Sequence, residues 1–162
     1  MSHFLEEIGL NEDDIDDNDA MPTFLNSSVA RPKTLIPVKS VDRLHAATAP
    51  TNATKFQQMC ESIDSTGLYL YDSSSTMNIE CRQFPKSSGY AEDPATGIAA
   101  GALVASLHRC KMNSSGDPDD SVSTMTTILQ GTAMRRPSQI KVKIDDYTTS
   151  STSTSTSNPS HS

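Results

Sequence analysis

The residues of this sequence best suited to chemistry are Asp93 and the segment Thr96-Gly97-Ile98, which stand where a helix is predicted to begin. The first N–H groups of a helix have no partner within it and carry the positive end of its dipole. They can therefore bind a carboxylate ligand with backbone donors alone. Asp93 lies beside that position, where it could carry a proton or accept a hydrogen bond. The structural alternative is that Asp93 only caps the helix, while Thr96 and Gly97 only shape the turn.

The element that must position these residues is the helix itself, which we expect over about residues 95–109. Asp93 fits the N-cap and Pro94 fits the first helical position. The run from Ile98 to Leu107 has no polar face, so we expect it to be covered on every side. It is too short to span a bilayer, which needs roughly 20 residues. The pattern predicts a central buried helix.

The rest of the chain shows short helical and alternating patterns around that helix. We expect a first helix over residues 3–9, a second capped by Ser40 and a third starting at Thr51. Strands are predicted over residues 34–39, 67–72, 78–84, 122–130 and 138–147. Within residues 122–130 we take Met125 and Ile128 to face inward, and we assign His45 to an exposed side without a role.

The acidic segment at residues 11–19 raises the question of a calcium site. An EF-hand loop needs a glycine at its sixth position and a bidentate Glu at its twelfth, and this segment contains no glycine. We therefore interpret it as a solvated connector, and we expect no metal site in the protein.

Composition excludes several classes of function. The net charge of −7 argues against binding to nucleic acid or to an anionic membrane surface. No stretch has the pattern of a signal peptide or a membrane span. The three cysteines form no CxxC motif, which favours free thiols, so we expect a cytoplasmic protein. Leu, Ile, Val and Phe make up only 29 of 162 residues, which indicates a thin core.

Two ordered motifs carry a family resemblance. The first is Arg82-Gln83-Phe84-Pro85, then Gly89, then Glu92-Asp93-Pro94-Ala95-Thr96-Gly97-Ile98-Ala99. The second is Gln130-Gly131, then Met134 and Arg136-Pro137-Ser138. Together they resemble the E-D-P-A-T-G-S-A and Q-G…M-G-R-P-S signatures of the phenazine-biosynthesis PhzF-like isomerases. The resemblance covers roughly residues 5–146 and matches only the C-terminal half of such proteins.

The resemblance implies an α+β fold similar to one lobe of diaminopimelate epimerase, in which a curved, mostly antiparallel sheet wraps around a central apolar helix. We accordingly divide the chain into a short helix with an acidic connector (residues 1–21), a PhzF-like C-terminal lobe (22–147) and a disordered Ser/Thr tail (148–162). A second PhzF-like lobe or a homodimer partner is expected to pack on this lobe.

The resemblance also implies chemistry. The family isomerises small cyclic hydroxy acids such as dihydro-hydroxyanthranilate by moving a proton, and it uses no cofactor. Its general acid/base is a Glu from the first lobe, and no stretch of this chain matches that lobe. What this chain offers is Asp93 as the partner carboxylate and the N–H groups near Thr96, Gly97 and Ile98 as a cradle for the acid. Ile98 stands where the family has Ser, and Arg135 where it has Gly.

Three hypotheses remain open. The chain is a PhzF-like isomerase or epimerase-type protein, incomplete without its first lobe and inactive alone. Alternatively it is a non-catalytic remnant that binds a small acid or a partner lobe. The third hypothesis is an interaction protein that works through its acidic segment and its tail. The turn at residues 30–33 also departs from the family, which has a glycine near Ala30; there Arg31 or Lys33 either holds an anionic substrate or is simply solvated.

Overall fold

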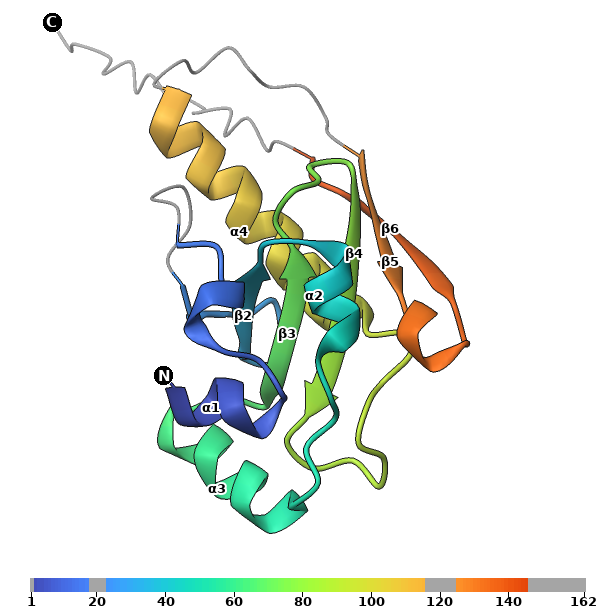
Figure 1. Ribbon diagram of the computed structural model, residues 1–162. Coiled ribbons are helices and arrows are strands. Elements are labelled where there is room, and N and C mark those ends of the chain that lie inside the picture. The colour runs from blue at the N-terminus through green and yellow to red at the C-terminus, as the bar shows by residue number, and fades with distance from the viewer. Residues whose placement is uncertain (1, 18–22, 116–124, 146–162) are drawn as a thin grey trace, which may run out of the picture.

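A six-stranded mixed sheet forms the centre of the molecule, with strand order β1-β2-β3-β4-β5-β6 (Figure 1). This computed structural model describes residues 2–17, 23–115 and 125–145, so the predicted tail lies outside the described residues. Three neighbouring pairs of strands are antiparallel, and the pairs β2/β3 and β4/β5 are parallel. The strands are β1 (Leu25–Ser27), β2 (Lys33–Val38), β3 (Gly67–Asp72), β4 (Asn78–Pro85), β5 (Met125–Gln130) and β6 (Ser138–Lys143). The prediction of an α+β fold with a mostly antiparallel sheet is confirmed.

Helices cover both faces of this sheet. Figure 1 shows α4 behind the sheet and the shorter helices in front of it. The helical elements are α1 (Ser2–Glu7), the 3₁₀ turn η1 (Glu12–Asp14), α2 (Val41–Ala46), α3 (Ala53–Ser62), α4 (Gly97–Ser115) and the 3₁₀ turn η2 (Thr132–Met134). No helix in the described parts of the chain is long and apolar enough to cross a membrane.

Two hydrophobic cores result, one on each face of the sheet. In β3, Leu68 and Leu70 face α1, α2 and α3, while Tyr69 and Tyr71 face α4. Side chains alternate between the faces of a strand, so a strand in the middle of a two-layered core is apolar at every position. The predicted strand over residues 67–72 is therefore buried throughout.

The central helix differs from its prediction in two ways. It runs from Gly97 to Ser115 instead of about 95–109. Its buried side includes Ala99 and Leu103, but Gly97, Ile98 and Ala105 are exposed. The expectation that the helix is covered on every side is therefore wrong within the described residues. Two of the three residues just named are Gly and Ala, which leave little apolar area in water.

The acidic segment is solvated only in part, since Glu12, Asp13 and Asp17 are exposed whereas Asp14 and Ile15 are buried. Asn11 caps η1, and the Asp14 side chain is buried. Both carboxylate oxygens of Asp14 accept hydrogen bonds from Arg43, from Nε at 2.6 Å and from Nη2 at 2.8 Å. Ile15 forms an isolated bridge with Val38. The N-terminal segment is thus tied to the edge of the first core.

Three smaller expectations also need correction. The helix predicted from Thr51 begins at Ala53 and is capped by Asn52. His45 is not without a role, because its Nε2 lies 2.6 Å from Oε1 of Glu80. Met125 is exposed while Ile128 is buried. Residues an odd number of positions apart point to opposite faces of a strand, so these two could not both face inward.

Candidate functional site

Asp93 lies in the loop that connects β4 to α4, three residues before the N-cap of the helix. Its N–H donates to the carbonyl of Gln83 at 3.0 Å, which joins the loop to the end of β4. Its Oδ1 accepts from the N–H of Ala95 at 3.1 Å, and its Oδ2 accepts from the hydroxyl of Thr96 at 2.7 Å. A carboxylate has about four lone-pair sites, so Asp93 keeps acceptor capacity for a ligand.

The N-cap of α4 is Thr96, because the first helical hydrogen bond runs from the N–H of Ala100 to the carbonyl of Thr96 at 3.0 Å. The expectation that Asp93 is the N-cap and that Pro94 starts the helix is therefore wrong. The N–H of Thr96 is also occupied, since it donates to Oε1 of Gln130 at 3.2 Å. Within the described residues, the N–H groups of Gly97 and Ile98 have no hydrogen-bond partner. The predicted cradle is thus reduced to these two donors.

Gln130, at the end of β5, joins the parts of this site, and its role was missed by the sequence analysis. Its Nε2 donates to the carbonyl of Asp93 at 2.7 Å and to the hydroxyl of Thr96 at 3.1 Å. Its Oε1 accepts from the hydroxyl of Tyr69 at 3.1 Å and from the N–H of Thr96. Gln130 is fully buried, and burial also raises the pKa of Tyr69 well above its ordinary value. The only sequence signal was its place in the Q-G motif.

Residues of the second motif also bind the loop between β4 and α4. The hydroxyl of Ser138 donates to the carbonyl of Pro94 at 2.7 Å. Gly131 has a φ of +84°, and a Cβ there would overlap a backbone carbonyl of residue 136 and come within 3.0 Å of the carbonyl of Pro94. A side chain at position 131 would therefore displace the loop. Ser138 and Gly131 therefore fix the position of the loop that carries Asp93.

Glu92, the neighbour of Asp93 in the first motif, is one half of a buried ion pair. Its two oxygens accept from Nε and Nη2 of Arg82 at 2.8 and 2.7 Å. Both side chains are only 8% exposed. Nη1 of Arg82 donates to the carbonyls of Leu44, His45 and Ala47 at the end of α2. The loop that carries Asp93 is thereby fixed to the opposite face of the sheet.

The two basic residues of the turn at residues 30–33 differ in their surroundings. Arg31 is exposed, as a solvated turn requires. Lys33 is buried, and its Nζ donates to the carbonyl of Thr66 at 3.3 Å. Burial lowers the pKa of Lys33, while the carboxylate of Asp93 acts in the opposite direction. Lys33 is therefore a buried basic group that interacts electrostatically with Asp93.

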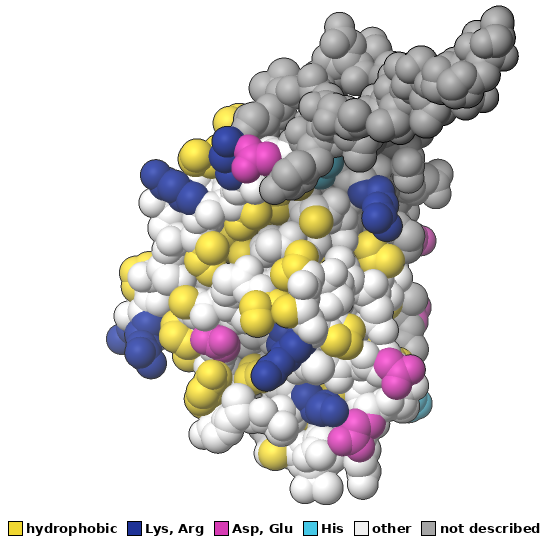
Figure 2. Space-filling view, turned by 180° about the vertical axis from the view of Figure 1, so that it is seen from behind, with side chains coloured by type: hydrophobic (Ala, Val, Ile, Leu, Met, Phe, Trp, Pro, Cys, Tyr) yellow, Lys and Arg dark blue, Asp and Glu magenta, His cyan; other side chains and the backbone are white. Residues whose placement is uncertain are grey.

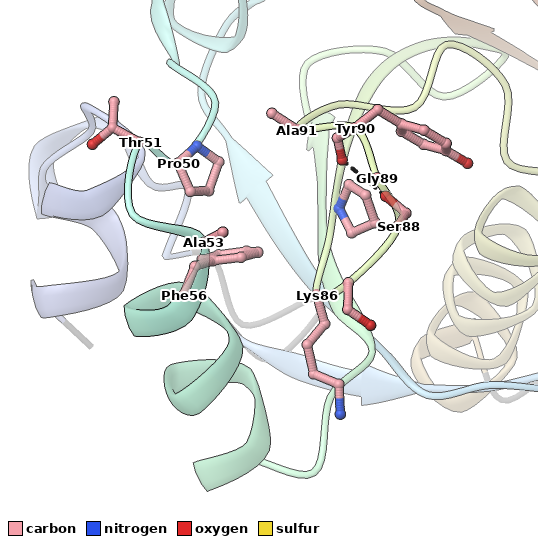
Figure 3. Close-up of a pocket in the computed structure, with 11 residues that line it drawn as sticks. Pro50, Thr51, Ala53, Phe56, Lys86, Ser88, Gly89, Tyr90 and Ala91 are labelled. Carbon is pink, nitrogen blue, oxygen red and sulfur yellow. Dashed lines mark hydrogen bonds between the residues drawn. The ribbon is translucent and has the colours of Figure 1, made fainter.

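A pocket of about 340 Å³ lies between the start of α3 and the loop that follows β4 (Figure 3). It is lined by Pro50, Thr51, Ala53, Phe56, Pro85, Lys86, Ser87, Ser88, Gly89, Tyr90 and Ala91. The lining contains no carboxylate and none of the predicted site residues. Figure 3 shows that the ring of Tyr90 points away from the pocket. The pocket therefore does not offer carboxylate acid–base chemistry.

Metal-ligating and nucleophilic groups do not gather near Asp93. The described residues contain no cluster of three or more His, Cys, Asp or Glu side chains that could hold a metal ion. Burial raises the pKa of Cys60 to about 11 and raises that of Cys81 further. These thiols are therefore protonated near neutral pH and are poor nucleophiles.

Comparison with known proteins identifies the family and the fold of the chain. The family model described as phenazine biosynthesis-like protein matches residues 5–157. A PhzF-family phenazine biosynthesis protein from Bacillus anthracis superposes with a TM-score of 0.67 at 21% identity, over 91% of this chain and 47% of its own. A predicted epimerase from Pseudomonas aeruginosa gives a TM-score of 0.62 at 23% identity, over 89% of this chain and 44% of its own. No curated protein matches the chain significantly. The chain thus spans slightly less than half the length of either solved structure.

Proposed function

Because the chain belongs to the phenazine biosynthesis-like protein family, we propose that it is an isomerase- or epimerase-type protein that moves a proton on a small carboxylic acid without a cofactor. The observation that carries this proposal is the network around Gln130. It holds Asp93 and Thr96 beside two free N–H groups at the start of a 19-residue helix.

The proposed roles follow from that network. The N–H groups of Gly97 and Ile98 bind the carboxylate of the acid, since they are unpaired and carry the positive end of the helix dipole. Asp93 accepts or returns the proton on the neighbouring carbon. Thr96 and Gln130 position Asp93, because both bond to it and neither has a free N–H to offer the acid.

We propose that the chain supplies one wall of the site and that a second PhzF-like lobe or a homodimer partner supplies the other. The exposed strip of α4 favours this arrangement. Gly97, Ile98 and Ala105 face solvent on it, and Val29 lies beside it, 57% exposed. Figure 2 shows apolar side chains gathered over this face of the molecule, with charged side chains around them. A partner lobe would cover them.

Ile98 keeps a second candidate function open. Its side chain is 41% exposed at the mouth of the proposed site, where the family's signature has a hydroxyl. A site without that hydroxyl could bind the acid without converting it. We therefore also consider a binding protein that has lost catalysis.

Deuterium incorporation from D₂O into dihydro-hydroxyanthranilate tests the proposal. It is followed by NMR for the chain alone and for the form in which it occurs in its source cells. Backbone amide shifts on adding the acid should centre on Gly97 and Ile98. Shifts confined to the pocket of Figure 3 would contradict the assignment. Binding without exchange in every form would favour the non-catalytic alternative.

The mass of the native protein decides what the second wall is. A mass well above 17.4 kDa, with a second lobe in the same chain, would place the missing Glu there. A mass that matches this chain alone would favour a separate partner or a second copy.

A further inference from the structure

The pocket of Figure 3 is a second candidate binding site, because none of the residues that line it belongs to the network around Asp93. Its volume of about 340 Å³ falls within the range of pockets that hold small ligands. One wall is the start of α3, and the other is the loop that follows β4. Figure 3 shows the ring of Phe56 extending from α3 toward that loop. A molecule in the pocket would therefore contact two separate elements of the fold.

Much of the pocket lining is apolar. Phe56 is 2% exposed and belongs to the first hydrophobic core. Pro50, Ala53, Pro85 and Ala91 add further apolar side chains to the lining. Such a lining binds the apolar part of a ligand by removing its surface from water. The pocket thus fits a ring or a short alkyl group.

The charged and hydroxyl groups of the lining favour an anion, because they include a lysine and no carboxylate. The Nζ of Lys86 lies 3.6 Å from Oε1 of Glu61 in α3. This ion pair is loose, since the distance is long for a hydrogen bond and the Glu61 side chain is 50% exposed. The hydroxyls of Thr51 and Ser87 have no hydrogen-bond partner among the described residues. The lining therefore offers one ammonium group and two hydroxyls to a ligand.

The loop after β4 adds backbone donors to these groups. Within the described residues, the N–H groups of Ser87, Ser88 and Gly89 have no hydrogen-bond partner. Gly89 has a φ of +41°, and the N–H of Tyr90 donates to the carbonyl of Ser88, so the segment makes a tight turn. Successive N–H groups in such a turn can bind a single anion. A phosphate monoester has three acceptor oxygens and more charge than a carboxylate, so it suits this number of donors better.

We propose that this pocket binds a small phosphate monoester with an apolar body, such as an aryl phosphate. The phosphate accepts hydrogen bonds from Nζ of Lys86, from the hydroxyl of Ser87 and from the N–H groups of the loop, and the apolar body packs on Phe56. Glu61 then loses its contact with Lys86, which costs little because exposed ion pairs contribute little. The site is separate from Asp93, so this inference goes beyond the proposed function and does not rest on it.

Titration of the purified chain with phenyl phosphate at pH 7 tests the site. Binding is followed by NMR through the backbone amide shifts, which should centre on Ala53 and residues 86–91 and not on Gly97 and Ile98. Phenol tests the need for the charge, and benzoate tests the preference for phosphate over carboxylate. Both should bind at least about tenfold more weakly than phenyl phosphate, because they lose hydrogen bonds to a charged group.

Four variants locate the binding site. Lys86→Met should weaken binding of phenyl phosphate by about tenfold, whereas Lys86→Arg should retain most of the affinity. Ala53→Leu should abolish binding and leave the fold intact, because Ala53 is an exposed helical residue whose longer side chain would fill the pocket. Glu61→Gln should tighten binding severalfold, since it removes the competing carboxylate. Lys143→Met is the matched control and should change nothing, because Lys143 also pairs with a carboxylate but lies outside the pocket.

The proposal would be overturned if phenol or benzoate bound as tightly as phenyl phosphate. An equal loss in Lys86→Met and Lys143→Met would also overturn it, as would shifts centred on Gly97 and Ile98. The absence of saturable shifts at about 10 mM phenyl phosphate would have the same meaning. The gain expected for Glu61→Gln is the sharpest readout, because misfolding of a variant cannot produce tighter binding.

Discussion

Replacing Glu92 by Gln removes the counterion of Arg82 and leaves a buried charge unpaired. Both side chains are 8% exposed, and the pair is bidentate at 2.8 and 2.7 Å. Breaking a buried pair from one side costs about 3–5 kcal/mol. That is a large part of a typical total of about 5–15 kcal/mol. For a chain of 162 residues, the loss corresponds to a melting temperature lower by about 6–20 °C.

Urea denaturation at pH 7 measures this loss, with the slope m checked for constancy. The matched control is Asp145→Asn, which breaks the exposed pair between Lys143 and Asp145 and should change nothing measurable. The double variant Arg82→Met with Glu92→Leu should recover part of the loss, because it leaves no unpaired charge. It should not recover all of it, because the carbonyls at the end of α2 lose their donor. A loss below about 1 kcal/mol for Glu92→Gln would refute the reasoning, since water would then reach Arg82.

Three further predictions follow from single contacts. Arg43 lowers the pKa of Asp14 below its ordinary value of 3.8, so this carboxylate stabilises the fold above that pH and loses its effect as the pH falls through the lowered pKa. Asp14→Asn should therefore lower the melting temperature at pH 7, and a difference that persists in strong acid would contradict this. In the native protein, Ellman's reagent should modify Cys110 before Cys60, because Cys60 is buried and burial raises its pKa to about 11. Simultaneous reaction of the two thiols would argue against a buried Cys60. Gly131→Ala should cost about 1–3 kcal/mol in thermal unfolding, because φ at this position is +84° and a Cβ has no room; an unchanged melting temperature would show that the loop yields.

The strands could be predicted well because their pattern is local. Residues 67–72 and 78–84 alternate between two apolar faces, and β3 and β4 occupy these ranges with one added residue, Pro85. The two inward positions of β5 were assigned wrongly because Met125 was judged by its hydrophobicity and not by its place in the alternation.

The site could be predicted only where its residues are close in sequence. Asp93 and Thr96 are both residue types that cap helices, and the sequence does not show that Gln130 binds Thr96 from a strand 34 residues away. The sequence likewise does not show that Glu92 pairs with Arg82, which lies in the preceding strand. Gln83 has a polar side chain on a core-facing position, which only the register of the sheet reveals. The catalytic role of Asp93 stays a prediction.

Deuterium exchange by the Asp93→Asn variant tests the central claim most directly. The wild type and the variant are compared in the form in which the protein occurs natively, alone or with a second lobe. Asp64→Asn is the control, because Asp64 is an exposed carboxylate. If Asp93 moves the proton, exchange into the acid should fall by about 10²- to 10⁴-fold in Asp93→Asn, while acid binding persists. A rate that stays within about a factor of two of the wild type would contradict the account, since general acid–base catalysis contributes far more than that.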